Sequence, residues 1–181
     1  MIKWLLRKSA HSFGKAYNYD VSYMIAIINT SAGAGLRLAL APLLSQYCAP
    51  KKAVGVWAGA TLAATLDADC GPCAQLAADM AIELGVEPSV LHLCIGGRAD
   101  EADDVGLGFR YARAILSGAP DVDELRADIN ALYGEKAVIS AAFAAASARF
   151  YPVLKKGLGH GVSCQQLKLG NITATVERHH E

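Results

Sequence analysis

Apolar residues recur every three or four positions along most of this chain, which is the period of an amphipathic helix. Residues 51–66 show it with Val54, Ala58, Leu62 and Leu66. The alternation of apolar and polar residues that is typical of strands is scarce. The pattern therefore predicts an all-α fold, with helices over residues 2–12, 20–30, 36–46, 51–66, 73–84, 88–95, 104–116, 121–132 and 135–151.

These stretches divide a single domain into three parts: N-terminal helices in residues 1–50, a helical core in 51–164 and a tail in 165–181. Pro152 is expected to end the last long helix, because proline disfavours a helical conformation in the residue before it. The tail from residue 171 has few apolar anchors and is predicted to be mobile, although residues 172–176 could form a short strand.

The net charge and the length of the apolar runs exclude some classes of binding partner. Lys plus Arg and Asp plus Glu each number 17, so no net positive field attracts nucleic acid or anionic lipid. The basic segment 1–8 has too short an apolar run for a signal peptide. Residues 21–44 come nearest to a membrane span, but Asn29 and Arg37 interrupt them. We therefore predict a cytoplasmic protein with neither nucleic acid nor a membrane as partner.

The most specific motif is Cys70-Gly71-Pro72-Cys73, which lies where one predicted helix ends and another begins. The N-terminus of a helix offers unpaired N–H groups and partial positive charge, and both stabilise a thiolate. Two cysteines at this spacing can form a disulfide and reopen it by thiol exchange. The motif predicts redox chemistry and places Cys73 at the start of a buried helix face.

Other interpretations of this pair compete with redox chemistry. A thioredoxin fold has the same tetrapeptide but needs a preceding strand, and the residues before Cys70 form a helical pattern. A zinc site could combine the pair with His92 and Cys94, yet residues two apart on a helix point roughly 200° away from each other. The pair could also simply pack in the core. We predict no metal and no cofactor.

We expect no chemical role for the remaining cysteines or for His160. Cys48, Cys94 and Cys164 lie among apolar or small residues and are expected to be core thiols. His160 lies between glycines and is expected at the surface.

The arrangement resembles the carboxymuconolactone decarboxylase and alkylhydroperoxidase D-like family. The resemblance covers residues 51–164 and rests on segments 69–76, 109–114 and 150–155, of which only the cysteine motif is specific. It implies a compact helical bundle, homo-oligomers, and reduction of hydroperoxides by Cys70 and Cys73. The glutamate and histidine that pass protons in the family's peroxidases correspond here to Ala58 and Ala77, which carry no proton. Another group must then carry these protons. The candidates nearest to the motif in sequence are Asp67, Asp69 and His92.

The expected function is that of a thiol-disulfide oxidoreductase or alkylhydroperoxidase-like antioxidant protein, with Cys70 as the exposed nucleophile and Cys73 as the resolving thiol. Its partners would be a hydroperoxide or disulfide substrate and a thiol-reductant protein. The alternative is a non-enzymatic helical oligomer that binds a small ligand or a protein and keeps a vestigial cysteine pair. A decarboxylase is a weaker third interpretation, because no cluster of basic and acidic residues fits a carboxylated lactone.

The apolar segment 21–44 and the alanine-rich stripes exceed what one small bundle hides, which predicts a homo-oligomer. Light scattering at micromolar concentration should therefore give a mass that is a multiple of the 19.0 kDa chain. A mass of one chain would contradict this prediction.

Overall fold

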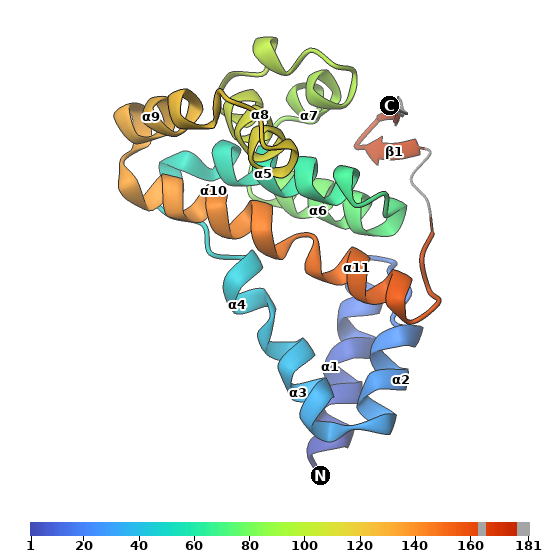
Figure 1. Ribbon diagram of the computed structural model, residues 1–181. Helices are drawn as coiled ribbons and strands as arrows, with labels where there is room; N and C mark the ends of the chain where they lie inside the picture. The colour runs from blue at the N-terminus through green and yellow to red at the C-terminus, as the bar shows by residue number, and fades with distance from the viewer. Residues whose placement is uncertain (163–165, 177–181) are drawn as a thin grey trace.

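The computed structural model describes residues 1–162 and 166–176. Helices form nearly all of this part of the chain, and a small hairpin follows them (Figure 1). Short 3-10 turns occupy Lys51–Ala53 and Ala99–Glu101. The elements are α1 Ile2–Ala16, α2 Ser22–Thr30, α3 Ala32–Leu40, α4 Pro42–Ser45, α5 Val54–Asp67, α6 Gly71–Glu83, α7 Pro88–Ile95, α8 Asp103–Ser117, α9 Val122–Tyr133, α10 Glu135–Ser147, α11 Phe150–Gly157, β1 Gln166–Leu169 and β2 Ile172–Thr175.

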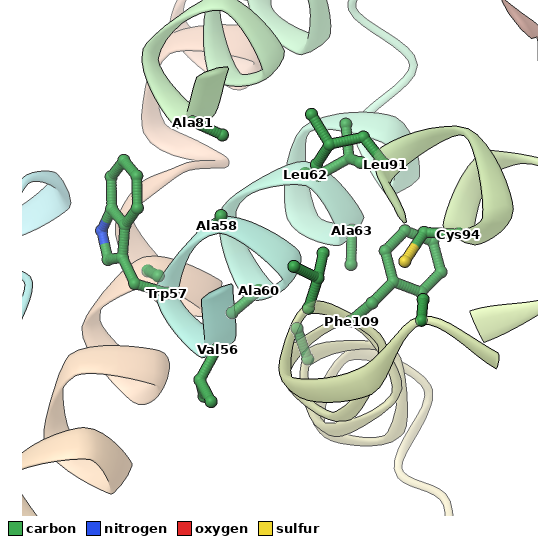
Figure 2. Close-up of a cluster of buried hydrophobic side chains, with 14 of the residues drawn as sticks. Val56, Trp57, Ala58, Ala60, Leu62, Ala63, Ala81, Leu91, Cys94 and Phe109 are labelled. Atoms are coloured by element: carbon green, nitrogen blue, oxygen red, sulfur yellow. The ribbon is translucent and has the colours of Figure 1, made fainter. Parts of the chain in front are cut away.

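Helix α5 is the centre of the core, with α6, α8 and α10 around it (Figure 1). Every residue from Gly55 to Thr65 is buried, so the helix is apolar on all sides and not on one stripe. Figure 2 shows Val56, Ala60 and Leu62 of this helix among side chains of the neighbouring helices. The four-residue spacing therefore located this helix correctly but did not reveal that it is surrounded.

Glycines set the contact between α5 and α8. A side-chain carbon on Gly59 would collide with the carbonyl oxygen of Val105, and one on Gly108 would collide with the carbonyl oxygen of Val56. Each helix thus presents a bare backbone where the other crosses it. The two helices approach each other as closely as their backbones permit.

Two of the predicted helices are interrupted in the structure, each near a proline. The helix expected over 36–46 is two helices, because α3 ends at Leu40 and Pro42 starts α4. The helix expected over 135–151 breaks after Ser147, and α11 begins at Phe150. Pro152 does not stop α11, because it lies in the first turn, where its missing N–H costs no hydrogen bond.

The C-terminal hairpin corrects the all-α prediction. Strands β1 and β2 pair antiparallel, with Leu167 opposite Ala174, and the strand expected at 172–176 is confirmed. Leu167, Leu169 and Ala174 are buried in the core. Apolar residues on one face of the hairpin anchor the described part of the tail, so residues 171–176 pack more closely than the few apolar positions in the tail led us to expect. Residues 177–181 lie outside the described part.

The N-terminal helices α1, α2 and α3 lie together at one end of the molecule, away from α7 and α9 (Figure 1). Among the described residues, the stretch 135–157 alone is long and apolar enough to cross a membrane. Length and composition select it, and the core helix of a soluble protein passes the same test. Its α10 part places Ala137, Ala141 and Ala144 in the core.

The substitution Gly59→Ala should destabilise the fold, because its methyl group meets the backbone of α8, which has no room to move. We expect a loss of roughly 1–3 kcal/mol in the free energy of unfolding, measured in urea. Gly157→Ala is the control, since nothing lies within 4 Å of its side-chain position. This control should stay within about 1 kcal/mol of wild type. Equal stability of the two variants would contradict the close contact.

Candidate functional site

The cysteine motif follows the turn after α5 and forms the start of α6. Asp69 has a left-handed φ of 47°, a conformation that aspartate tolerates, and this residue turns the chain after α5. Cys70 is the N-cap residue of α6, and Pro72 lies in the first turn, as the sequence predicted. Cys70 and Cys73 form a disulfide, with their Cα atoms 5.3 Å apart.

Both cysteines are buried, which corrects the expectation of an exposed Cys70. The exposed fraction is 1% for Cys70 and 5% for Cys73. The segment after α11 folds back over the start of α6, where the N–H of Gly71 donates to the carbonyl of Val162 at 3.1 Å. This contact between distant segments covers the N-cap, and the sequence near the motif contains no sign of it.

A cavity of about 210 Å³ lies beside the disulfide, between the N-terminal helices and the core. Cys73 lines the cavity, and Cys70 is not among the lining residues. Most of the wall is apolar or aromatic, including Phe13, Ile28, Trp57 and Met80. A molecule that enters this cavity therefore reaches the Cys73 side of the disulfide.

Tyr19 connects Cys73 to the buried amine of Lys155. The hydroxyl of Tyr19, also on the cavity wall, lies 3.8 Å from the Cys73 sulfur. The Nζ of Lys155 donates to the same hydroxyl at 3.4 Å. The amine also lies 4.8 Å from the ring centre of Tyr19 and 5.3 Å from that of Tyr23. Aromatic faces attract a cation at these distances, which partly offsets the loss of water around it.

Burial controls the acidity of these groups. Lys155 is 2% exposed, and this desolvation lowers the pKa of its amine, although the charge of Asp20 opposes the shift. Desolvation also raises the pKa of Tyr19. The site thus holds an amine that loses its proton more readily than a lysine in water, and a phenol that stays neutral.

Cys48 and Cys94 are not part of the cavity wall. Cys94 is buried in the core as expected, and burial raises its pKa to about 12 (Figure 2). Cys48 is half-buried, and burial raises the pKa of its thiol as well. Cys164 lies outside the described residues. Within the described residues, 1–162 and 166–176, no three His, Cys, Asp or Glu side chains gather as metal ligands. The set Cys70, Cys73, His92 and Cys94 is therefore not assembled as a metal site.

The candidate proton carriers near the motif do not line the cavity. Asp67 forms an ion pair with Arg149 at 3.2 Å, and neither it, Asp69 nor His92 is part of the wall. Of the two alanines at the family's relay positions, Ala77 lines the cavity. Ala58 is buried in the core (Figure 2).

His160 corrects the expectation of a surface histidine. It is half-buried, and its ring centre lies 6.3 Å from that of Tyr23. Its backbone N–H donates to the carbonyl of Lys155 at 2.8 Å. The glycines on either side of it suggested an exposed loop, but the segment packs against the N-terminal helices.

Sequence reasoning missed Tyr19 and Lys155. Both are far from the motif along the chain, separated from their partners by 54 and 136 positions. One signal was present: Lys155 falls three positions after Pro152 on the apolar side of an amphipathic helix, where Pro152 is buried too. A lysine on the apolar face of a helix is a candidate buried charge.

Comparisons of the chain with protein-family models, with curated proteins and with solved structures find no match.

The buried amine should make stability depend on pH in a way that Lys155→Met removes. The pKa of Lys155 in the folded protein lies below its ordinary value of 10.5. Between these two pKa values, the unfolded chain therefore binds more protons than the folded chain. Wild type should therefore gain stability over that alkaline window relative to Lys155→Met. Below both pKa values the gain is absent, and the variant should have its largest advantage there.

Urea unfolding at several pH values measures this difference, and Lys156→Met is the matched control. That substitution removes an exposed positive charge from the next position of α11. A stability difference between wild type and Lys155→Met that does not change with pH would contradict the prediction.

Proposed function

We propose that this protein is a thiol-disulfide oxidoreductase that acts as an alkylhydroperoxidase-like antioxidant. One observation carries the proposal: the Cys70–Cys73 disulfide closes the start of α6, and one of its two cysteines lines a cavity. A pair that only packs in the core needs no such access. The pair itself stores two electrons, so the proposal invokes no metal and no cofactor.

In the reduced state, we assign attack to Cys73, because it is the cysteine that the cavity reaches. Its thiolate attacks one oxygen of a hydroperoxide, the O–O bond breaks, and an alcohol leaves after taking up a proton. Cys73 is then a sulfenic acid. The thiol of Cys70 attacks that sulfur, water leaves, and the disulfide forms. The two roles are the reverse of those that we expected from the sequence.

A thiol-reductant protein would restore the dithiol. Its thiolate attacks one sulfur of the Cys70–Cys73 disulfide and forms a mixed disulfide, and its second thiol then releases the reduced pair. A disulfide substrate would be reduced by the same two steps in the opposite direction. This cycle fits a cytoplasmic protein, where thiols are kept reduced between turnovers.

The family and the assembly are parts of the same proposal. The helical core around the cysteine motif supports a fold of the alkylhydroperoxidase D-like type. Exposed apolar side chains support a homo-oligomer: Leu43 is 73% exposed on α4, and Ile139 and Phe143 are exposed on α10 beside it. A second copy that covers this surface would remove these side chains from water.

The second candidate is a helical oligomer that binds a small ligand in the same cavity. The apolar wall favours it, because a cavity lined in this way binds apolar molecules without any chemistry. The alanines at positions 58 and 77 also favour it, since they remove the family's proton carriers. The cysteine pair would then be a structural remnant.

The two candidates differ in what peroxide does to the reduced protein. Under the proposed function, mild peroxide should remove two titratable thiols and link Cys70 to Cys73. Cys73→Ser should abolish turnover, because Cys73 is the one cysteine that lines the cavity among the described residues. Cys70→Ser should trap a sulfenic acid or a mixed disulfide on Cys73. Peptide mapping by mass spectrometry after reaction with a thiol reagent identifies each product.

Cys94 is the internal reference for these maps. Its pKa of about 12 leaves almost no thiolate at neutral pH, so it should stay unmodified in every variant. If the pair is no more reactive than Cys94, and peroxide forms no disulfide, the redox proposal fails. The ligand-binding candidate then takes its place.

A further inference from the structure

We propose that Tyr19 and Lys155 relay protons to and from the sulfur of Cys73. This role rests on the proposed redox function and supplies a step that the function requires. A thiol must lose its proton before it attacks a hydroperoxide, and the leaving oxygen must gain one. The family's own carriers for these protons are replaced by Ala58 and Ala77.

The contacts form one continuous path. The Tyr19 hydroxyl lies 3.8 Å from the Cys73 sulfur. In the disulfide the sulfur can only accept from this hydroxyl, whereas in the reduced pair either atom can be the donor. Lys155 Nζ lies 3.4 Å from the same oxygen. Tyr19 therefore touches the reacting atom and is assigned as a catalytic residue. Lys155 acts through Tyr19.

The environment fits a group that exchanges its proton. Lys155 is buried under the rings of Tyr19 and Tyr23, and no ion pair of Lys155 occurs among the described residues. Burial without a carboxylate partner lowers the pKa of its amine, so the neutral form is accessible at a lower pH than for a lysine in water. A lysine that served only to hold the fold together would normally be paired.

The charged groups around this path are few. Asp20 follows Tyr19, is exposed, and favours the ammonium form of Lys155 from a distance. Tyr23 on α2 and Tyr151 on α11 both have pKa values raised by burial, so they stay neutral through the neutral range. His160 lies against Tyr23. Of these groups, Asp20 is the one whose charge acts on Lys155.

In the oxidative step, the proton that Cys73 loses is the proton that the leaving alkoxide gains. The thiol of Cys73 gives its proton to the oxygen of Tyr19, while the hydroxyl proton of Tyr19 passes to the neutral amine of Lys155. The thiolate attacks the hydroperoxide, the O–O bond breaks, and its electron pair stays on the leaving alkoxide. The proton returns from the ammonium through Tyr19 to that alkoxide, which leaves as an alcohol. Cys73 is oxidised to a sulfenic acid, and Lys155 is an amine again.

The relay predicts how fast Cys73 reacts at each pH. We would use the Cys70→Ser variant, in which Cys73 cannot form the internal disulfide, and follow alkylation of Cys73 by iodoacetamide with peptide mapping. Tyr19→Phe removes the bridging hydroxyl and keeps the ring, and Lys155→Met removes the amine and keeps an apolar chain of similar length. Both should raise the apparent pKa of Cys73, with about tenfold slower alkylation at neutral pH for a rise of one unit.

Two matched controls separate the relay from general damage. Tyr17→Phe removes a hydroxyl that donates to Glu83 at 2.8 Å, and Lys156→Met removes an exposed charge beside Lys155. Neither should move the pH profile. Tyr19→Phe retains the aromatic packing, so it tests the relay even if Lys155→Met does not fold.

An unchanged pH profile in folded Tyr19→Phe would overturn the relay. Thiol counting in the otherwise unaltered chain reports separately on the proposed function. A wild-type protein that forms the Cys70–Cys73 disulfide, with a pH profile indifferent to Tyr19, would disprove the relay and leave the redox function standing. A profile that depends on Tyr19, without any disulfide under peroxide, would leave the relay and disprove the redox cycle.

Discussion

The contact of the α5 and α8 backbones at Gly59 and Gly108 is the constraint on which the rest of the structure depends. Because the two helices touch without side chains between them, α5 lies deep enough for α6 and α10 to cover its other faces. The position of α5 fixes the turn that follows it, and that turn contains Cys70. The cysteine pair is therefore held next to a helix that is buried on all sides, as a site with defined geometry requires.

The cavity has a different origin, because its two walls come from different parts of the chain. Core helices supply Trp57, Cys73 and Met80, whereas N-terminal segments supply Phe13 and Tyr19. The disulfide is thus embedded on the core side and faces the N-terminal helices on the other. A cysteine pair shielded from bulk water in this way meets only what enters between the two walls.

Local pattern predicted much of the fold and little of the site. The helical period located α5, α7 and α8, and the spacing of Cys70 and Cys73 indicated the disulfide, since both depend on near neighbours in sequence. The exclusion of Cys70 from the cavity wall, the burial of Lys155 and the docking of the hairpin through Leu167 depend on contacts between segments far apart. Periodicity contains no information on such contacts, so sequence reasoning looked for proton carriers among the nearest acids, Asp67 and Asp69.

The distance along the chain between Tyr19 and its partners has a consequence for folding. Contacts that close loops of 54 and 136 residues belong to the slow part of a folding reaction, because loop-closure entropy must be offset before they form. During synthesis Cys73 leaves the ribosome well before Lys155, and also before α8 and α10, which pack against α5 in the folded protein. A newly made chain therefore has both cysteines before Lys155 can close its contact with Tyr19, and until then the thiols of the surrounding solution govern the state of the two sulfurs.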